Sequence, residues 1–383
     1  MIHECKEEFY FTGDKLSDTL FDESAVFFDI ETTGFSPVHS QIYLIGCAYR
    51  KDTQICAEQF FAESKEEEPL ILSSFLELLS RFKTLISFNG IGFDIPFLKA
   101  KCEIYNQPDR FSDMNCIDIF KSVSMVKFLL KLENYKQKTI EAFLELKRED
   151  QYSGGELINV YDHYTKEPNK EDLHLLLLHN YEDIMGMPAL LPVLSYVELF
   201  KGNYSIEEAK ICDYQGYDGI TQKELLITLK NHYPVPKRVS FQYKDYYLIA
   251  NDYKTSIRIP IYEGELKYFY SDYKNYYYLP EEDIALHKSV ASYVDKGYRE
   301  NARAANCYNR KTSRFLSQYE EIMNPVFYKE YKDSTGYFEL TEDFCQSEVM
   351  LERYVNHILK LMLQQKKAKA ATNKSTKKNG DRK

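Results

Sequence analysis

Three apolar runs within residues 25–61 constrain the fold of this chain more than any other feature. The runs AVFFDI, QIYLIGCAY and QICAEQFF each have the length of a strand, and short turn-forming segments near Gly34 and Lys51 separate them. Consecutive strands with connections this short pair antiparallel. The segment therefore predicts a three-stranded antiparallel meander.

Helices and strands alternate after this meander. Apolar residues recur at helical spacing over 69–82, a short buried strand fits TLISFN at 84–89, and a helix fits 94–105. A further strand is expected at 113–119, running into a helix through Leu132, and more helices at 139–147, 156–166 and 171–200. This order favours parallel crossovers beside the meander. Residues 1–200 are thus predicted to be an α/β domain whose mixed sheet, three antiparallel strands plus parallel strands, is flanked by helices.

The character of the sequence changes near residue 200. The runs YYLIA and SIRIPIY flank NDYKT, which predicts a hairpin, and residues 282–306 indicate one helix. We expect residues 201–362 to form a smaller, tyrosine-rich α+β accessory domain. The Lys-rich segment 363–383 is expected to be a disordered basic tail.

The distribution of charge bears on whether this protein binds nucleic acid over a broad surface. The net charge is −10, and the last 18 residues carry eight Lys or Arg against one Asp, so the rest of the chain carries −17. An acidic body argues against a protein that holds nucleic acid by broad electrostatic attraction. It suits an enzyme that gathers carboxylates around cations.

Localisation signals and cysteine pairs are missing from the sequence. No apolar run approaches the ~18 residues of a membrane span, and the first residues, MIHECKEEFYF, do not have the pattern of a secretory signal. The eight cysteines form no CxxC pair and no zinc-like spacing with histidine. We expect free thiols and a cytoplasmic location.

Two acids stand on the first of the apolar runs, in VFFDIETTG. Residues two apart on a strand point to the same face, so Asp29 and Glu31 project together. Like charges this close raise each other's pKa unless a cation neutralises them. The alternative is a strand end with two solvated acids.

A third acid opens the helix predicted at 94–105. In SFNGIGFDIPFLKAK a strand ends at Asn89, glycines make a turn, and Asp94 follows. Asp94 is a candidate metal ligand, although an Asp at a helix start also caps free N–H groups.

The segment LLLLHNYEDIMGM supplies the remaining candidates. On a helix His179 and Asp183 are four residues apart and share one face, with Gly186 close to that face. The alternative is an apolar helix with a satisfied His–Asp pair. In the predicted mixed sheet, the strand, the helix start and this helix can converge at one edge. Four acids without a Cys partner suit a hard cation, Mg²⁺ or Mn²⁺.

Taken together, DIETTG, NGxxFDxPF and the late helix ending in Asp resemble motifs I, II and III of the DEDD exonucleases, a ribonuclease-H-like superfamily that includes the proofreading domains of family B DNA polymerases. The YprB-like group is the most similar, and residues 134–164 resemble its segment between motifs II and III. The resemblance covers roughly residues 20–200.

This resemblance implies a stand-alone 3′→5′ exonuclease acting on single-stranded nucleic acid or a 3′ end of DNA or RNA. It implies two metal ions, Mg²⁺ or Mn²⁺, held by Asp29, Glu31, Asp94 and Asp183. It further implies that Thr32, Thr33, Asn89 and Phe93 contact the substrate. A structure-specific endonuclease and a non-catalytic nucleic-acid-binding or scaffold protein are the competing functions.

The chain departs from the family pattern next to the last acid. The tyrosine-type subclass has Tyr four residues before that Asp and the histidine-type has His five before it, whereas here His179 is four before and Tyr181 two before. Steps of 100° place Tyr181 on another face, so His179 is the candidate general base. Arg148 and Asp150 either contact the strand or brace a helix junction.

A basic segment lies in the accessory domain. Residues 284–314 hold seven Lys or Arg against Asp295 and Glu300, and Lys296, Arg299 and Arg303 recur at helical spacing. One interpretation is a phosphate-tracking surface with tyrosines at 268–278 for base stacking. The other is an ordinary amphipathic helix on a tyrosine-rich sheet.

Overall fold

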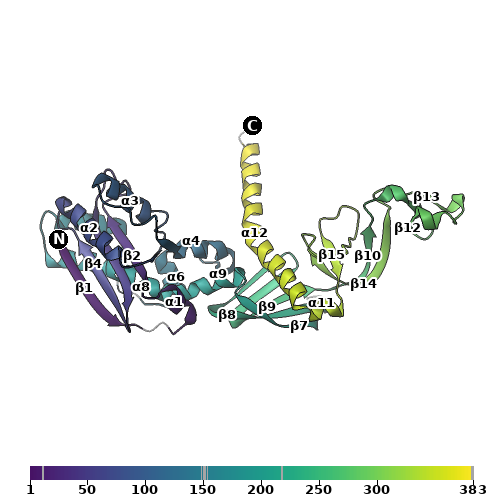
Figure 1. The fold of residues 1–383 in the computed structure, drawn as a ribbon, viewed down its shortest axis with the longest axis horizontal. Coiled ribbons are helices and arrows are strands. Elements are labelled where there is room, and N and C mark those ends of the chain that lie inside the picture. The colour runs from purple at the N-terminus through teal and green to yellow at the C-terminus, as the bar shows by residue number, and fades with distance from the viewer. Residues whose placement is uncertain (11–12, 148, 150–151, 153, 217–218, 381–383) are drawn as a thin grey trace. The chain divides into compact units, whose positions relative to one another are not determined.

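The computed structural model describes residues 1–10, 13–147, 149, 152, 154–216 and 219–380, with side chains up to residue 365. The chain divides into two compact units (Figure 1). The first comprises Met1–Asn203 with Tyr233–Arg238, and the second comprises Tyr204–His232 and the chain from Val239 on.

The first unit is built on a six-stranded sheet with the order β1-β4-β3-β2-β5-β6. Its strands are β1 (Ile2–Phe9), β2 (Ala25–Thr32), β3 (Ile42–Lys51), β4 (Gln54–Phe61), β5 (Thr84–Ser87) and β6 (Asn115–Asp118). β2, β3 and β4 pair antiparallel, and β5 and β6 continue the sheet parallel to β2. The predicted mixed sheet is confirmed. The antiparallel edge strand β1 is an addition that the sequence did not indicate, because its IHECKEEF is mostly charged and exposed.

Helices cover both faces of this sheet. They are α1 (Lys15–Leu20), α2 (Glu68–Leu79), α3 (Asp94–Ile104), α4 (Ile119–Val123), α5 (Lys127–Leu130), α6 (Gln137–Phe143), α7 (Gly154–Tyr164), α8 (Lys170–Leu190) and α9 (Ser195–Phe200). Phe28 of β2 lies in a core with α2 and α3, whereas Tyr43 and Phe61 pack with α7 and α8. Because side chains alternate along β2, its acids face the side that α8 covers.

α8 is the helix that brings distant residues to β2. Asn169 caps its start by accepting a hydrogen bond from the backbone N–H of Asp172 at 2.8 Å. The stretch Lys170–Phe200 is long and apolar enough to cross a membrane by length and composition, but 67% of its apolar window is buried inside the protein. Leu176 and Leu177 pack against strand residues. This packing is that of a core helix, and it fixes α8 across the sheet.

The second unit contains three small sheets among its described residues, with the orders β7-β8-β9, β10-β14-β15 and β12-β11-β13. The strands are β7 (Tyr204–Gln215), β8 (Thr221–Tyr243), β9 (Tyr246–Pro260), β10 (Tyr262–Phe269), β11 (Tyr276–Leu279), β12 (Ile284–His287), β13 (Glu300–Asn301), β14 (Tyr308–Gln318) and β15 (Gly336–Glu339). The helices are α10 (Lys288–Ala291), α11 (Glu342–Gln346) and α12 (Glu348–Gly380). Tyr246, Phe338 and Tyr354 share a buried aromatic core with α11 and α12.

Three expectations for this half of the chain differ from the structure. NDYKT lies inside β9, and the hairpin turn falls at Lys244–Asp245, where Lys244 takes a positive φ of 56°. The segment 282–306 is not one helix: β12 and β13 pair on either side of β11, because strand pairing with YYYL outweighs the helical spacing of the charges. α12 continues through Gly380, where the sequence predicts a disordered tail from residue 363, since Lys, Ala and Gln favour helix.

His357 on α12 gives the second unit a pH-dependent stability. Its side chain is buried, and its Nε2 accepts a hydrogen bond from the backbone N–H of Tyr319 at 3.2 Å. Burial lowers the pKa of His357 from 6.5 to about 4. The depressed pKa contributes stability above pH 6.5, and we expect about 3 kcal/mol of it to be lost as the pH falls through 4.

Urea titrations followed by circular dichroism, at neutral pH and near pH 4, measure this loss. His357→Gln keeps a hydrogen-bond acceptor but does not titrate, so its stability should fall by clearly less than that of the parent protein over the same pH range. Equal losses in the two proteins would assign the acid sensitivity to other groups.

Candidate active site

The first two acids of the site lie on β2 and face α8. Asp29 is paired in register with Gly46 of β3, and the register shifts between Glu31 and Thr32, where the strand ends in an irregularity. Glu31 is buried, at 8% exposure. A carboxylate at such a position needs a partner, because water cannot reach it to stabilise its charge.

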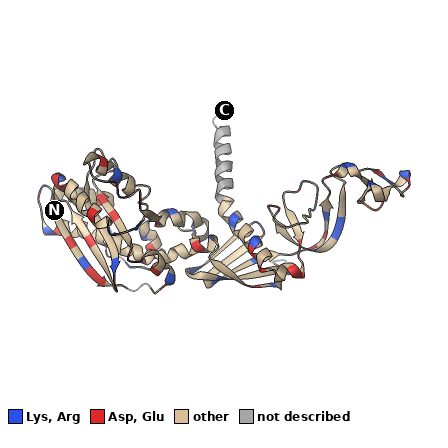
Figure 2. Cartoon of the chain, in the orientation of Figure 1, with Lys and Arg blue, Asp and Glu red and all other residues tan. Residues whose placement is uncertain are grey.

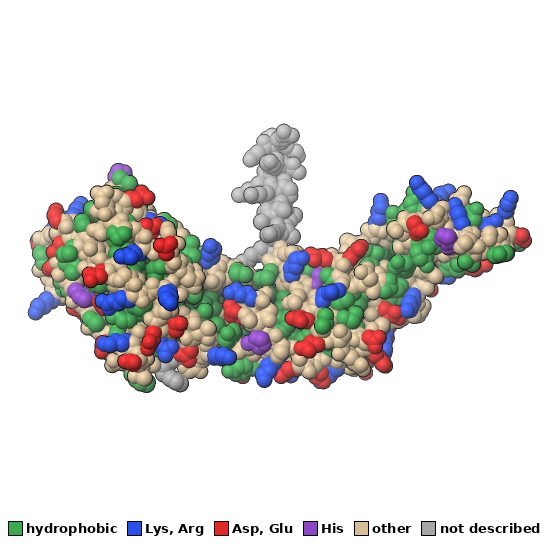
Figure 3. Space-filling view, viewed as in Figure 1, with side chains coloured by type: hydrophobic (Ala, Val, Ile, Leu, Met, Phe, Trp, Pro, Cys, Tyr) green, Lys and Arg blue, Asp and Glu red, His purple; other side chains and the backbone are tan. Residues whose placement is uncertain are grey.

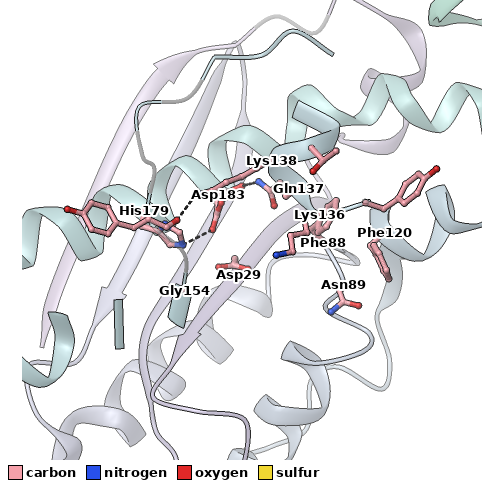
Figure 4. Close-up of a pocket in the computed structure, with 13 residues that line it drawn as sticks. Asp29, Phe88, Asn89, Phe120, Lys136, Gln137, Lys138, Gly154, His179 and Asp183 are labelled. Atoms are coloured by element: carbon pink, nitrogen blue, oxygen red, sulfur yellow. Dashed lines mark hydrogen bonds and ion pairs between the residues drawn. The ribbon is translucent and has the colours of Figure 1, made fainter. Parts of the chain in front are cut away.

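α8 supplies that partner and a third acid. The Nε2 of His179 lies 3.3 Å from Oδ2 of Asp183 and 3.5 Å from Oε1 of Glu31. One ligand atom from each of these three side chains falls within 4.8 Å of the others. Figure 4 shows His179 and Asp183 linked on the same face of α8, above Asp29. A strand and a helix about 150 residues apart in sequence thus form one cluster of donors.

Asp94 joins the cluster from the start of α3. Burial raises its pKa to about 7, whereas the N–H groups of its own backbone and of Ile30 lower it. The influence of Ile30 places this carboxyl beside β2. Burial also raises the pKa of Asp29 well above its ordinary value, and the charges of Asp94, Glu31 and Asp183 raise it further. The four acids are therefore neighbours, and a bound cation would reduce the repulsion between their negative charges.

Asn180 is a residue of the site that the sequence motifs did not indicate. This side chain is fully buried, its Nδ2 donates to Oδ2 of Asp29 at 3.3 Å, and its Oδ1 accepts from Nε2 of Gln59 at 3.0 Å. The amide lowers the pKa of Asp29 against the dominant effect of burial. A polar residue beside His179, directly after the apolar run LLLL, was the signal available in the sequence. Asn180 is a positioning residue for Asp29.

Gly46 makes room for this amide, so Gly46→Ala should displace it. An alanine Cβ would lie 2.0 Å from Oδ1 of Asn180, closer than any stable contact. We expect a loss of about 1–3 kcal/mol in unfolding free energy, measured by urea titration. Gly155→Ala is the matched control, because nothing lies within 4 Å of its Cβ on α7. A Gly46→Ala protein as stable as the control would show that Asn180 is not held as described.

A cavity of about 630 Å³ opens beside the cluster. It is lined by Asp29, Phe88, Asn89, Phe120, Tyr135, Lys136, Gln137, Lys138, Thr139, Tyr152, Gly154, His179 and Asp183. Figure 4 shows Lys136 entering the cavity from the side opposite His179. Gln137 donates from Nε2 to the backbone carbonyl of Asp183 at 3.0 Å and so fixes this part of α8 against α6. Carboxylates, amines and aromatic rings therefore face one space.

Of the predicted substrate contacts Asn89, Thr32 and Thr33, only Asn89 lines the cavity. Asn89 lines the cavity and takes a positive φ of 67°, and its N–H donates to Oδ1 of Asp118 at 3.1 Å. Thr32 donates to the carbonyl of Gly34, and the Thr33 hydroxyl accepts from the N–H of Gln41. Neither threonine lines the cavity.

Two aromatic residues singled out in the sequence lie away from the cavity. Phe93 packs its ring against Phe35 and Phe97 and does not line the cavity. Tyr181 points away from the acids, and its hydroxyl donates to Glu8 of β1. Arg148 and Asp150 lie outside the described residues.

The donor set fits a hard divalent cation. Glu31, Asp183 and Asp29 offer carboxylate oxygens, which Mg²⁺ and Mn²⁺ prefer, and His179 adds an imidazole nitrogen beside them. The crowding that raises the pKa of Asp29 is a second reason for the fit, because a cation would stabilise the ionised form.

Comparison with known proteins agrees with this geometry. Residues 26–195 match the family model of the RNase_H superfamily. No curated protein sequence matches this chain.

Solved structures similar to this chain include three DNA- or nucleotide-handling proteins. The family B DNA polymerase of the hyperthermophilic archaeon Pyrobaculum calidifontis has 14% identity and a TM-score of 0.35, covering 66% of this chain and 35% of the polymerase. Brucella melitensis NrnC bound to pGG has 15% identity and a TM-score of 0.31, with 48% and 78% covered. Escherichia coli exonuclease I in complex with a dT13 oligonucleotide has 10% identity and a TM-score of 0.29, with 54% and 55% covered.

The chain therefore spans about a third of the polymerase and about half of exonuclease I. The family match and the observed strand order, an antiparallel meander followed by parallel strands with helices on both faces, lead to one assignment. Residues 26–195 of this chain form a ribonuclease-H-like domain.

Proposed function

We propose that this protein is a metal-dependent 3′→5′ exonuclease that hydrolyses phosphodiester bonds of single-stranded DNA or RNA. The observation that carries the proposal is the clustering of Asp29, Glu31, Asp94 and Asp183 beside one cavity, which Asp29 and Asp183 line, in a ribonuclease-H-like domain. Those acids come from a strand, a helix start and a late helix, so a structural role such as capping does not account for the set.

The cations would be Mg²⁺ or Mn²⁺. A pair of such ions supplies Lewis-acid stabilisation of the phosphodiester oxygens and lowers the pKa of bound water. Glu31 and Asp183 would hold one ion together with Asp29, and Asp94 would hold the other.

His179 is placed to move a proton. Its Nε2 lies beside Glu31 and Asp183 and next to the cavity, and once those carboxylates hold a cation it would be able to accept a proton from the attacking water. Imidazole is suited to this near neutral pH. The buried position keeps the ring oriented by the two carboxylates.

The remaining lining residues fit a nucleic-acid strand. Lys136 and Lys138 face the cavity and bring positive charge toward the phosphates. Phe88, Phe120 and Tyr135 offer rings on which bases stack without regard to sequence. Asn89 adds an amide at the same wall.

The test is a nuclease assay on single-stranded DNA and RNA labelled at the 5′ end, with Mg²⁺, Mn²⁺ or EDTA. We expect ladders that shorten from the 3′ end only when metal is present. A substrate blocked at its 3′ end should survive. Internal cleavage of the blocked substrate would establish the endonuclease instead, and no cleavage at micromolar enzyme would favour the non-catalytic binding protein.

We further propose that the protein works in the cytoplasm. The cysteines of the described residues are free thiols, which is the state that a reducing compartment maintains. Fractionation of cells followed by immunodetection tests this location.

A further inference from the structure

The sheet β12-β11-β13 and its connecting turns carry a surface that the proposed reaction does not use. We define this surface, the basic aromatic surface, by the cations Lys288, Lys296, Arg299 and Arg303 and the tyrosines Tyr277, Tyr293 and Tyr298. The four cations come from α10 and from the segments between β12 and β14. Figure 2 and Figure 3 show Lys and Arg exposed in the part of the second unit that contains β12 and β13. We propose that it binds single-stranded nucleic acid.

The cations of this surface are available to an anionic partner. Among the described residues, Lys288, Lys296, Arg299 and Arg303 form no ion pair with a carboxylate. Nearby cations do: Lys267 pairs with Glu330, Arg310 with Glu265, and Lys311 with Glu339. The structure thus pairs these three cations of β10 and β14 with carboxylates and leaves the four cations of the basic aromatic surface without such a pair among the described residues.

Local charge contrasts with that of the whole chain. Residues 284–314 hold seven Lys or Arg and two acids, whereas the net charge of the protein is −10. A positive segment on an acidic protein attracts a polyanion locally without broad adhesion. The positive charge alone would fit either a nucleic-acid strand or an acidic protein surface. The exposed tyrosines favour the nucleic-acid strand.

The aromatic groups supply the second half of the recognition. The ring of Tyr277 lies between two cations, with Nζ of Lys288 at 5.2 Å and Cζ of Arg299 at 4.6 Å from its centroid. Tyr293 is 92% exposed and Tyr298 is 55% exposed. Rings and cations that alternate on a surface suit a nucleic-acid strand. The rings can stack on bases of any sequence, and the cations can bind the phosphates between them.

Packing explains why these tyrosines stay at the surface. The small core of this part of the chain, Ala285, Ala302 and Cys307, is covered by four other tyrosines, Tyr270, Tyr273, Tyr276 and Tyr278. A lipid surface would instead favour larger aliphatic or indole side chains, and the chain has no tryptophan. The exposed rings are therefore better suited to stacking than to insertion in a membrane.

This inference takes from the proposed function only the class of polymer, so the two can fail separately. Binding is measured without metal, in EDTA, by fluorescence anisotropy of a labelled oligothymidylate of about 20 nucleotides. The full chain carrying Lys288→Gln, Lys296→Gln and Arg303→Gln should bind at least about tenfold more weakly at low salt, with a log–log salt slope smaller by about 2. Arg299 is left unchanged because it donates to the carbonyl of Ala291.

A control of equal charge tests whether position matters. Lys210→Gln, Lys230→Gln and Lys254→Gln remove three exposed cations from the β7-β8-β9 sheet and should change the affinity by less than about twofold. Tyr293→Ala removes a ring that is 92% exposed, so we expect the unit to stay folded and the binding to weaken by about fivefold or more.

Several outcomes would overturn the proposal. These are equal losses in the two triple variants, no loss with Tyr293→Ala, or binding to phosphatidylserine vesicles with none to the oligonucleotide. Hydrolysis of a short substrate of about three nucleotides should be the same in the parent and in the Lys288, Lys296 and Arg303 variant, because none of these three residues belongs to the candidate active site. Weakened binding with no hydrolysis in any protein would leave this inference standing and refute the nuclease.

Discussion

Asp29→Asn should reduce metal-dependent hydrolysis by about a thousandfold or more while leaving the protein folded. Asp29 stands at the centre of the cluster, because Asp94, Glu31 and Asp183 all raise its pKa. Asparagine keeps the shape and can still pair with Asn180, but it offers one neutral oxygen where a cation needs a charged ligand. The measurement is the initial rate of 3′ shortening with Mn²⁺ at saturating substrate.

The control for this substitution is Asp113→Asn, an exposed carboxylate away from the cavity, which should retain the parent rate. Thermal melting adds a readout independent of activity. Mn²⁺ should raise the melting temperature of the parent and not that of Asp29→Asn, because only the parent folded state binds the ions tightly. A variant that keeps most of the rate would remove Asp29 from the site.

The same cluster predicts the pH dependence of the metal-free protein. Asp94 has a pKa of about 7 when folded against 3.8 for the ordinary group, so the folded state holds this proton more tightly. Its effect on stability is therefore favourable at low pH and is lost as the pH rises from 3.8 to about 7. Asp94→Asn should flatten this decline in melting temperature in EDTA. An unchanged profile would contradict the burial of this carboxyl group.

Lys101→Met should cost about 3–5 kcal/mol of unfolding free energy, the largest stability effect that we expect. Lys101 of α3 is 4% exposed, and its Nζ lies 2.8 Å from Oε1 of Glu68 and 2.7 Å from the carbonyl of Ser40. Without the ammonium, the buried carboxylate of Glu68 keeps only neutral donors, the hydroxyl of Tyr105 and the N–H of Ile42. Urea titration followed by circular dichroism measures the loss.

The exposed ion pair of Lys210 with Glu208 provides the comparison. Its atoms are also 2.8 Å apart, but both side chains are about half exposed, so Lys210→Met should cost roughly 0–1 kcal/mol. Adding Glu68→Gln to Lys101→Met should recover part of the stability, because it removes the uncompensated charge. Equal effects of the two lysine substitutions would show that burial does not strengthen the Lys101 pair.

The amino-acid sequence predicts the first unit well because its signals are local. The three apolar runs and the short gaps between them determine the meander β2-β3-β4, and the period of two along β2 places Asp29 and Glu31 on one face. The i, i+4 spacing of His179 and Asp183 likewise needs only the geometry of a helix. In the second unit the local pattern gave a wrong prediction. The charges in 282–306 recur at helical spacing, but the segment instead forms strands that pair with β11.

Only the tertiary structure decided which residues meet. Asn180 reaches Asp29 because α8 crosses β3 at a glycine, and Lys101 finds Glu68 because α2 and α3 cover the same face of the sheet. Such contacts depend on how elements far apart in the chain pack, and no local pattern of residues records that packing. The sequence by itself determined the acids and the faces they occupy, whereas the fold determined that they meet beside one cavity and which partners hold them there.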